Sequence, residues 1–525
     1  MSMDLGTLRL ARRAEALLAP LAGKPGASIG LVRDGRLVVH ACGGVASIEA
    51  GTATGPDTLY RIASVSKQFT CAAITLLAQE GKLSPADPVG RHLAGLPAWG
   101  ERVTLDHLMR NTSGVRDMLE LMRGGGLDLS AIVAGGALDA AIARSTGLNF
   151  EPGSRFLYSN SAFRLLGLVV EKISGMPLEA FLETRLFAPA GMTRTRHTPD
   201  VHHPVPGLAT GYIPRPGGFI RAPHGFALGG EGGLVSGIED LALWVAACEG
   251  GIFQGLEEQL VTPLPFTNGT PNNYRRGLQV EGWRGISITS HGGLWPGFKT
   301  AFQRVPQQGL AVIVISNNGA ADPGAMAQSM MEAALERVLH PAPAMPGLEG
   351  ITGSWVAEDI VPGGRSFELW VEKGRPMAKQ NGTAFALAPD EAGRLASARG
   401  TIHFALERDG EAFTLHEEAG HSAPLIRVAE PVPLPDDAPG TYVCADLGAS
   451  WVVAADGSWS VEGPHARSGT FRTEGLARDF ARFHSPGALF DHWFDVRFLR
   501  SEVGLITGLL ANGSRARGMR FARVD

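Results

Sequence analysis

A serine and a lysine three residues apart form the first candidate site in the sequence. They lie in Arg61-Ile-Ala-Ser-Val-Ser-Lys-Gln-Phe-Thr70, and an apolar run with helical spacing follows. Residues i and i+3 share a helix face, so the Ser64 hydroxyl and the Lys67 amine can meet. A serine hydroxyl needs a base to take its proton, and lysine is a base only where its pKa is lowered. Ser64 is therefore the predicted nucleophile and Lys67 its base; the alternative is a helix-capping serine beside a chance lysine.

The second candidate is Tyr158-Ser-Asn160, which lies between a Pro-Gly turn and a helix expected from about residue 161. A loop that enters a helix is a good place to present polar groups. The Tyr158 phenol can relay the serine proton to a leaving amine, and the Asn160 side chain can bind a substrate amide. The alternative is a surface turn with one packed tyrosine.

The third candidate is His291-Gly-Gly293-Leu294, which follows an apolar strand at 286–289. The glycines would let a substrate lie close to the strand edge. The backbone N–H of Leu294 could then pair with that of Ser64 as an oxyanion hole, with His291 as a polar or proton-relaying group. The alternative is a Gly-rich hairpin with an exposed histidine. Each motif is weak alone, but three in this order favour one active site.

The surrounding elements predict how these motifs are positioned. A helix opens the chain, and 29–32 and 37–39 flank Asp34-Gly35 as a hairpin. Strands at 286–289, 301–305 and 310–316 and a helix at about 323–339 come late, after a long helical insert. This order predicts an α/β unit whose sheet is built from both ends of the segment.

Two Pro-rich breaks, 340–346 and 431–435, separate this unit from two shorter segments rich in alternating strands. We expect domains at 1–340, 346–431 and 436–525, with the last two as small β-barrels or sandwiches. A faint repeat is formed by Gly353-x-Trp-Val-x-x-Asp359 and Gly440-x-Tyr-Val-x-x-Asp446. This repeat leaves open whether the two β-domains arose by duplication.

Composition narrows the class of protein. The chain has 525 residues, 44% of them hydrophobic and 19% charged, with a net charge of −5. No basic stripe points to nucleic acid, no apolar run is long enough for a membrane span, and four scattered cysteines suggest neither a metal site nor dense disulfides. We expect no cofactor or metal, and a cytoplasmic protein because the N-terminus lacks a signal-like apolar run. A homodimer is the default assembly for a soluble enzyme.

Taken together, Ser64-x-x-Lys67, Tyr158-x-Asn160 and His291-x-Gly293 resemble the signature elements of the serine β-lactamase/penicillin-binding superfamily, in its class C-like branch. The resemblance covers about residues 7–340. It implies a β-lactamase-like catalytic domain with a mixed sheet and helical insert. The stretch from Ser64 to Cys71 and the two trailing β-domains are similar to bacterial D-aminopeptidases, which carry two C-terminal antiparallel β-barrels.

This resemblance implies an acyl-enzyme hydrolase that removes an N-terminal D-residue from short peptides, amides or esters. It also implies that a loop of the last barrel reaches the active site and helps to select a free α-amino group; Asp491 is the candidate acceptor there. Gln279 stands where the family has an active-site asparagine. Alternatives are an esterase, a β-lactamase-like hydrolase, a D,D-carboxypeptidase and a non-turnover penicillin sensor.

Overall fold

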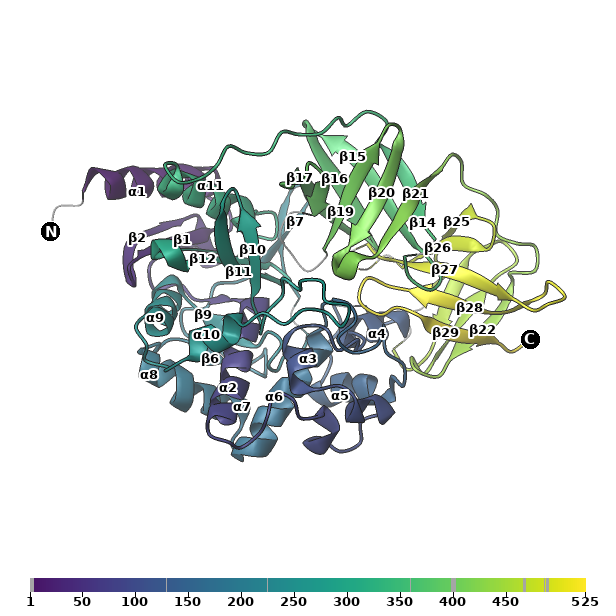
Figure 1. Ribbon diagram of the computed structural model, residues 1–525, viewed down its shortest axis with the longest axis horizontal. Coiled ribbons are helices and arrows are strands. Elements are labelled where there is room, and N and C mark those ends of the chain that lie inside the picture. The colour runs from purple at the N-terminus through teal and green to yellow at the C-terminus, as the bar shows by residue number, and fades with distance from the viewer. Residues whose placement is uncertain are drawn as a thin grey trace.

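The computed structural model divides into a helix-rich N-terminal unit and two β units, coloured green and yellow in Figure 1. The residues that it describes are 4–128, 130–223, 225–358, 360–397, 403–465, 469–485, 487 and 491–525.

A six-stranded sheet is the centre of the N-terminal unit, with the strand order β10-β11-β12-β13-β1-β2 and antiparallel pairing throughout. The strands are β1 (Ala27–Arg33), β2 (Arg36–Gly43), β10 (Gln279–Trp283), β11 (Ile286–Trp295), β12 (Phe298–Val305) and β13 (Leu310–Ser316). The prediction that the two ends of this segment build one sheet is confirmed: β1 pairs with β13 across the whole insert.

Alternation along β13 shows why the sheet is covered on both faces. Val312 and Val314 pack with helices α1 (Leu5–Leu18) and α11 (Pro323–Leu335), whereas Ile313 and Ile315 pack into the core of the helical insert. Successive strand residues point to opposite faces, so a fully apolar strand requires a layer on each side. Figure 1 shows α1 and α11 together on one side and the insert below the sheet.

The insert runs between β2 and β10. Its α-helices are α2 (Lys67–Gln79), α3 (Leu105–Met109), α4 (Met118–Gly124), α5 (Gly135–Arg144), α6 (Asn160–Ser174), α7 (Leu178–Leu182), α8 (Ala188–Ala190), α9 (Ile238–Glu249) and α10 (Leu256–Val261). Its short strands are β3 (Val45–Ser47), β4 (Thr52–Ala53), β5 (Tyr60–Arg61), β6 (Arg196–His197), β7 (Tyr212–Arg215), β8 (Gly218–Arg221) and β9 (Leu234–Ser236).

The first β unit is a closed eight-stranded barrel. Its strands are β14 (Gly353–Ala357), β15 (Arg365–Glu372), β16 (Arg375–Gln380), β17 (Thr383–Pro389), β18 (Leu395–Ser397), β19 (Phe404–Asp409), β20 (Ala412–Glu417) and β21 (Ser422–Val428).

The second β unit is an eight-stranded antiparallel sheet in the order β24-β23-β22-β29-β28-β27-β26-β25. Its strands are β22 (Gly440–Cys444), β23 (Ala449–Val453), β24 (Trp459–Glu462), β25 (Thr473–Ala477), β26 (Phe480–His484), β27 (Trp493–Arg500), β28 (Ile506–Asn512) and β29 (Met519–Arg523). Two backbone hydrogen bonds between Trp459 and Phe471 bring its edges together. The expected pair of small antiparallel β units is confirmed.

The faint sequence repeat opens both β units, with Gly353 starting β14 and Gly440 starting β22; Asp359 lies outside the described residues. None of the helices in the described ranges combines the length and hydrophobicity needed to cross a bilayer.

Candidate active site

The turn that carries Ser64, the predicted nucleophile, connects β5 to α2 through a single 3-10 turn, Ala63–Ser66. Ala63 has a φ of +50°, a left-handed conformation that is unfavourable for a residue with a Cβ. The neighbouring backbone holds the turn, because the N–H of Ile62 donates to the carbonyl of Leu234. A strained residue next to a nucleophile is a common feature of active sites, and here it presents Ser64 at a half-buried position.

Lys67 begins α2 and directs its amine back to Ser64. Its Nζ lies 3.1 Å from the Ser64 Oγ and donates to the Asn160 Oδ1 at 2.9 Å. The backbone carbonyl of Glu231 accepts a third hydrogen bond. The expected meeting of Ser64 and Lys67 on one helix face is therefore present, and three oxygens fix the position of the amine.

The electrostatics of Lys67 suit a base. Its side chain is completely buried, and this burial lowers the pKa of Lys67 to about 7. The nearby charges of Glu231 and Asp117 oppose the effect, and the Arg515 cation adds to it. At neutral pH a substantial fraction of Lys67 is therefore an uncharged amine with a free lone pair.

Tyr158 lies two residues before α6, on the irregular segment expected for it. The Lys67 Nζ is 4.8 Å from the centre of its ring. Its hydroxyl interacts with Ser64 but completes no hydrogen bond of normal geometry with any described residue. Burial raises the pKa of Tyr158 well above its usual value, so the phenol keeps its proton at neutral pH.

His291 lies on β11 beside Tyr158, with their ring centres 6.1 Å apart. Its Nδ1 is 2.6 Å from the carbonyl oxygen of Gly292, and its Nε2 is 3.0 Å from the Tyr274 hydroxyl. Burial, reinforced by Lys67, lowers the pKa of His291 to about 3. The ring is thus neutral, with Nδ1 protonated and Nε2 accepting from Tyr274.

Gly293 is required by contact between β11 and the nucleophile turn. A Cβ at this position would lie 2.3 Å from the carbonyl oxygen of Ile62. The glycine therefore permits close approach of two protein backbones, a role that the sequence alone assigned to substrate approach. Leu294, the next residue, has a side chain that is 57% exposed.

Gln279 and the first barrel meet at the edge of this site. The Gln279 Nε2 donates to the His403 Nε2 at 3.0 Å, and the His403 Nδ1 lies 2.6 Å from Glu418. The His403 ring stacks on Phe156 at 4.6 Å between ring centres. His403 of the first barrel thus contacts both Gln279 and the segment that carries Tyr158.

Asp491 lies on the surface of the last β unit with an exposed side chain, and its backbone carbonyl packs against Gly382. It has no described contact with Ser64 or Lys67. The neighbouring His492 is buried and lies 2.9 Å from Glu120. Residues 486 and 488–490 of the loop expected to reach the site lie outside the described residues.

Asp117, Glu231 and Arg515 are site residues that sequence reasoning missed. Asp117 is fully buried, caps α4 and accepts a hydrogen bond from the Asn160 backbone N–H at 2.7 Å. Glu231 is paired with Arg164 at 3.3 Å, and its second carboxylate oxygen is buried without a partner among the described residues. A Gly-rich run around Glu231 was visible in the sequence, but no local signal marks Arg515.

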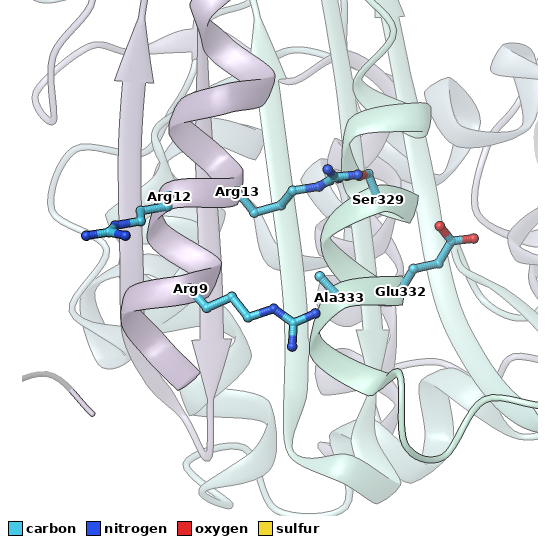
Figure 2. Close-up of a pocket in the computed structure, with 6 residues that line it drawn as sticks. All are labelled: Arg9, Arg12, Arg13, Ser329, Glu332 and Ala333. Atoms are coloured by element: carbon cyan, nitrogen blue, oxygen red, sulfur yellow. Dashed lines mark hydrogen bonds between the residues drawn. The ribbon is translucent and has the colours of Figure 1, made fainter. Parts of the chain in front are cut away.

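A groove between α1 and α11 lies on the face of the sheet opposite the helical insert. Figure 2 shows the residues that line it. Arg13 reaches across it to Ser329, and Arg9 pairs with Glu336. These exposed arginines hold the two helices together, and no contact among the described residues joins the groove to Ser64 or Lys67.

Comparison with known proteins agrees with this geometry. The beta-lactamase family profile matches residues 14–335. A D-aminopeptidase of Cereibacter sphaeroides is 30% identical, with all of both chains covered. A D-aminopeptidase of Brucella anthropi is 26% identical, over 95% of this chain and 96% of the relative.

Solved structures show the same fold. The octameric penicillin-binding protein homologue from Pyrococcus abyssi matches with a TM-score of 0.55 and 25% identity, over 81% of this chain and all of that one. The D-amino acid amidase from Ochrobactrum anthropi SV3, solved with D-phenylalanine, matches with a TM-score of 0.53 and 22% identity, over 62% of this chain and 99% of that one.

Proposed function

This chain belongs to the beta-lactamase family and is a serine hydrolase, and on that premise we propose that it is a D-stereospecific aminopeptidase. It would release an N-terminal D-residue from short peptides, amides or esters. The observation that carries the proposal is the buried Lys67 amine, 3.1 Å from the Ser64 hydroxyl and with a lowered pKa. Full-length relatives named D-aminopeptidases support the substrate class.

In the proposed acylation, Lys67 takes the Ser64 proton as the Oγ–carbon bond forms. The N–H groups of Ser64 and Leu294 would hold the developing oxyanion. The carbon–nitrogen bond then breaks, and Tyr158 donates a proton to the leaving amine and regains one from Lys67. These reaction steps require a neutral Lys67 and a protonated Tyr158, and burial favours both forms.

Deacylation repeats these roles with water as the nucleophile. Water adds to the acyl carbon, the Ser64 Oγ leaves with a proton, and the free acid departs. We assign His291 a supporting role, because its neutral ring accepts from Tyr274 and borders Tyr158 without holding a transferable charge. We assign Asn160 the role of orienting Lys67 ahead of that of binding a substrate amide, since its side-chain carbonyl oxygen already accepts a hydrogen bond from the Lys67 amine.

For the substrate ammonium group we propose Asp491 as the acceptor, because it adjoins His492 in the segment that contacts α4 through Glu120. Gln279 would line the leaving-group side together with His403. The Asp491→Asn variant should raise KM for substrates with a free amine and leave KM for their N-acetyl forms unchanged. Equal changes for both substrate series would remove Asp491 from this role.

The deciding experiment compares D- and L-alanine p-nitroanilides, each with a free and an acetylated amine. Turnover of only the free D-form supports the D-aminopeptidase, whereas turnover regardless of stereochemistry and acetylation supports a general esterase or amidase. Hydrolysis of a chromogenic cephalosporin would favour a β-lactamase-like enzyme. A burst without steady turnover would favour a penicillin sensor. The Ser64→Ala variant is the matched control and should lose turnover in each assay.

The sequence-based proposals of a cytoplasmic location and a homodimer are tested separately, by cell fractionation and by light scattering of the purified protein.

A further inference from the structure

The loop between β28 and β29 docks on the catalytic unit next to Asp117. The backbone carbonyl of Arg515 accepts hydrogen bonds from the Asp117 N–H at 3.1 Å and from the Asn149 side chain at 3.3 Å. The Arg116 guanidinium donates to the carbonyl of Arg517 at 3.0 Å. Figure 1 shows this yellow hairpin beside α4. The last β unit is therefore anchored next to the catalytic residues by a loop separate from the one that precedes His492.

Arg515 also brings its charge to this junction. Its Nη1 lies 3.6 Å from the Asp117 Oδ2, and its side chain is 23% exposed, whereas that of Asp117 is fully buried. A buried carboxylate is costly without a cation and hydrogen-bond donors. The Asp117 side chain has both, since it accepts from the N–H of Asn160 and of Leu119.

A short chain of contacts connects this ion pair to the predicted base. The Asp117 Oδ2 accepts from the Asn160 backbone N–H at 2.7 Å, at the first residue of α6. The Asn160 Oδ1 in turn accepts from the Lys67 Nζ at 2.9 Å. Displacement of Asp117 would shift the start of α6 and, with it, the oxygen that orients the Lys67 amine.

We propose that Arg515, supplied by the last β unit, is a positioning residue that neutralises Asp117 and keeps Lys67 an uncharged, correctly oriented base. The inference rests on the roles proposed above for Ser64 and Lys67, but it does not depend on which substrate is cleaved. It gives the last β unit an electrostatic role in the chemistry, in addition to any role in substrate selection.

The charges around Lys67 agree with this assignment. The ionisable groups that face it are Glu231, Asp117, Arg515, Cys71, Tyr158 and His291. Arg515 is the cation among them, and it lowers the pKa of both Lys67 and Tyr158. Without Arg515, no cation among these groups would offset the charge of Asp117, and the pKa of Lys67 would rise.

The test measures the rate at which a fluorophosphonate probe labels Ser64 between pH 5 and 10, in the full-length protein. Arg515→Met should move the rise in rate to higher pH, with labelling about tenfold slower at pH 6.5 and within threefold of wild type at pH 9, since one pKa unit is a factor of ten. Arg515→Lys keeps a cation, so its profile should return most of the way to that of the wild type. Arg520→Met, at an exposed position of β29, should follow the wild-type curve.

Two outcomes would overturn the proposal. One is a profile of Arg515→Met that overlaps the wild type. The other is a loss of equal size at every pH in both Arg515 variants, which marks a structural role only. Failure of the proposed substrate class looks different: wild type would label normally and show the Arg515 effect, yet leave D-alanine p-nitroanilide intact.

Discussion

The Tyr274 hydroxyl donates to the Nε2 of His291 across 3.0 Å, because the opposite ring nitrogen is committed to the carbonyl of Gly292. Both side chains are buried, and each ring packs against Tyr158. Tyr274 therefore fixes the tautomer and the orientation of His291.

Removal of this hydroxyl should impair turnover. Tyr274→Phe leaves a buried nitrogen without its donor, an effect of about 1–3 kcal/mol, and we expect kcat/KM to fall about tenfold with little change in KM. Steady-state kinetics on D-alanine p-nitroanilide measure it. Tyr442→Phe, which removes a hydroxyl in the last β unit that donates to Ala438, is the matched control. Equal activity of the two variants would contradict the role of Tyr274.

The pH dependence of acylation should report Lys67. A lysine acts as a base only when neutral, and the pKa of Lys67 is about 7. The acylation rate should therefore fall about tenfold for each pH unit below 7 and level off above it. p-Nitrophenyl acetate is the suitable substrate because it has no ionisable amine of its own. A flat profile from pH 5 to 9 would show that Lys67 is not the titrating base.

Two neighbouring glycines offer a paired test of the nucleophile turn. Gly293→Ala places a Cβ 2.3 Å from the Ile62 carbonyl oxygen, whereas Gly292→Ala meets nothing closer than the Thr300 carbonyl oxygen at 3.7 Å. The first change must push the strand away from Ser64, so kcat/KM should fall at least tenfold; the second should change it less than about threefold. Similar losses in both variants would mean that the contact with Ile62 does not position the nucleophile.

A cluster of three arginines around one largely buried carboxylate should contribute to the stability of the protein. Arg155, Arg365 and Arg517, one from each unit, converge on the Glu417 carboxylate, which is 10% exposed. Glu417→Gln leaves these guanidinium groups without their shared carboxylate, which we expect to lower stability by about 3–5 kcal/mol. Thermal denaturation should show a clear decrease in melting temperature. Glu411→Gln, an exposed change in the same barrel, is the control and should melt like wild type. A wild-type melting temperature for Glu417→Gln would show that the junction does not stabilise the fold.

The sequence was sufficient wherever the relevant geometry is local. Ser64 and Lys67 meet because they lie three residues apart at a helix start, and the Pro-Gly turn before Tyr158 leads into α6 as expected. The short apolar run of β13, rich in valine and isoleucine, predicted a buried strand, since such a run is a local signal.

Tertiary structure decided the rest, because contacts between distant segments leave no periodic or spacing signal in the chain. The requirement for Gly293 comes from Ile62, and Gln279 is bound by a histidine of the first barrel. The sequence alone determined that a serine, a lysine, a tyrosine and a histidine could form one hydrolytic site. Only the fold placed Asp117 and Arg515 beside it, because the charge state of a buried lysine depends on every charge packed around it, whatever the separation along the chain.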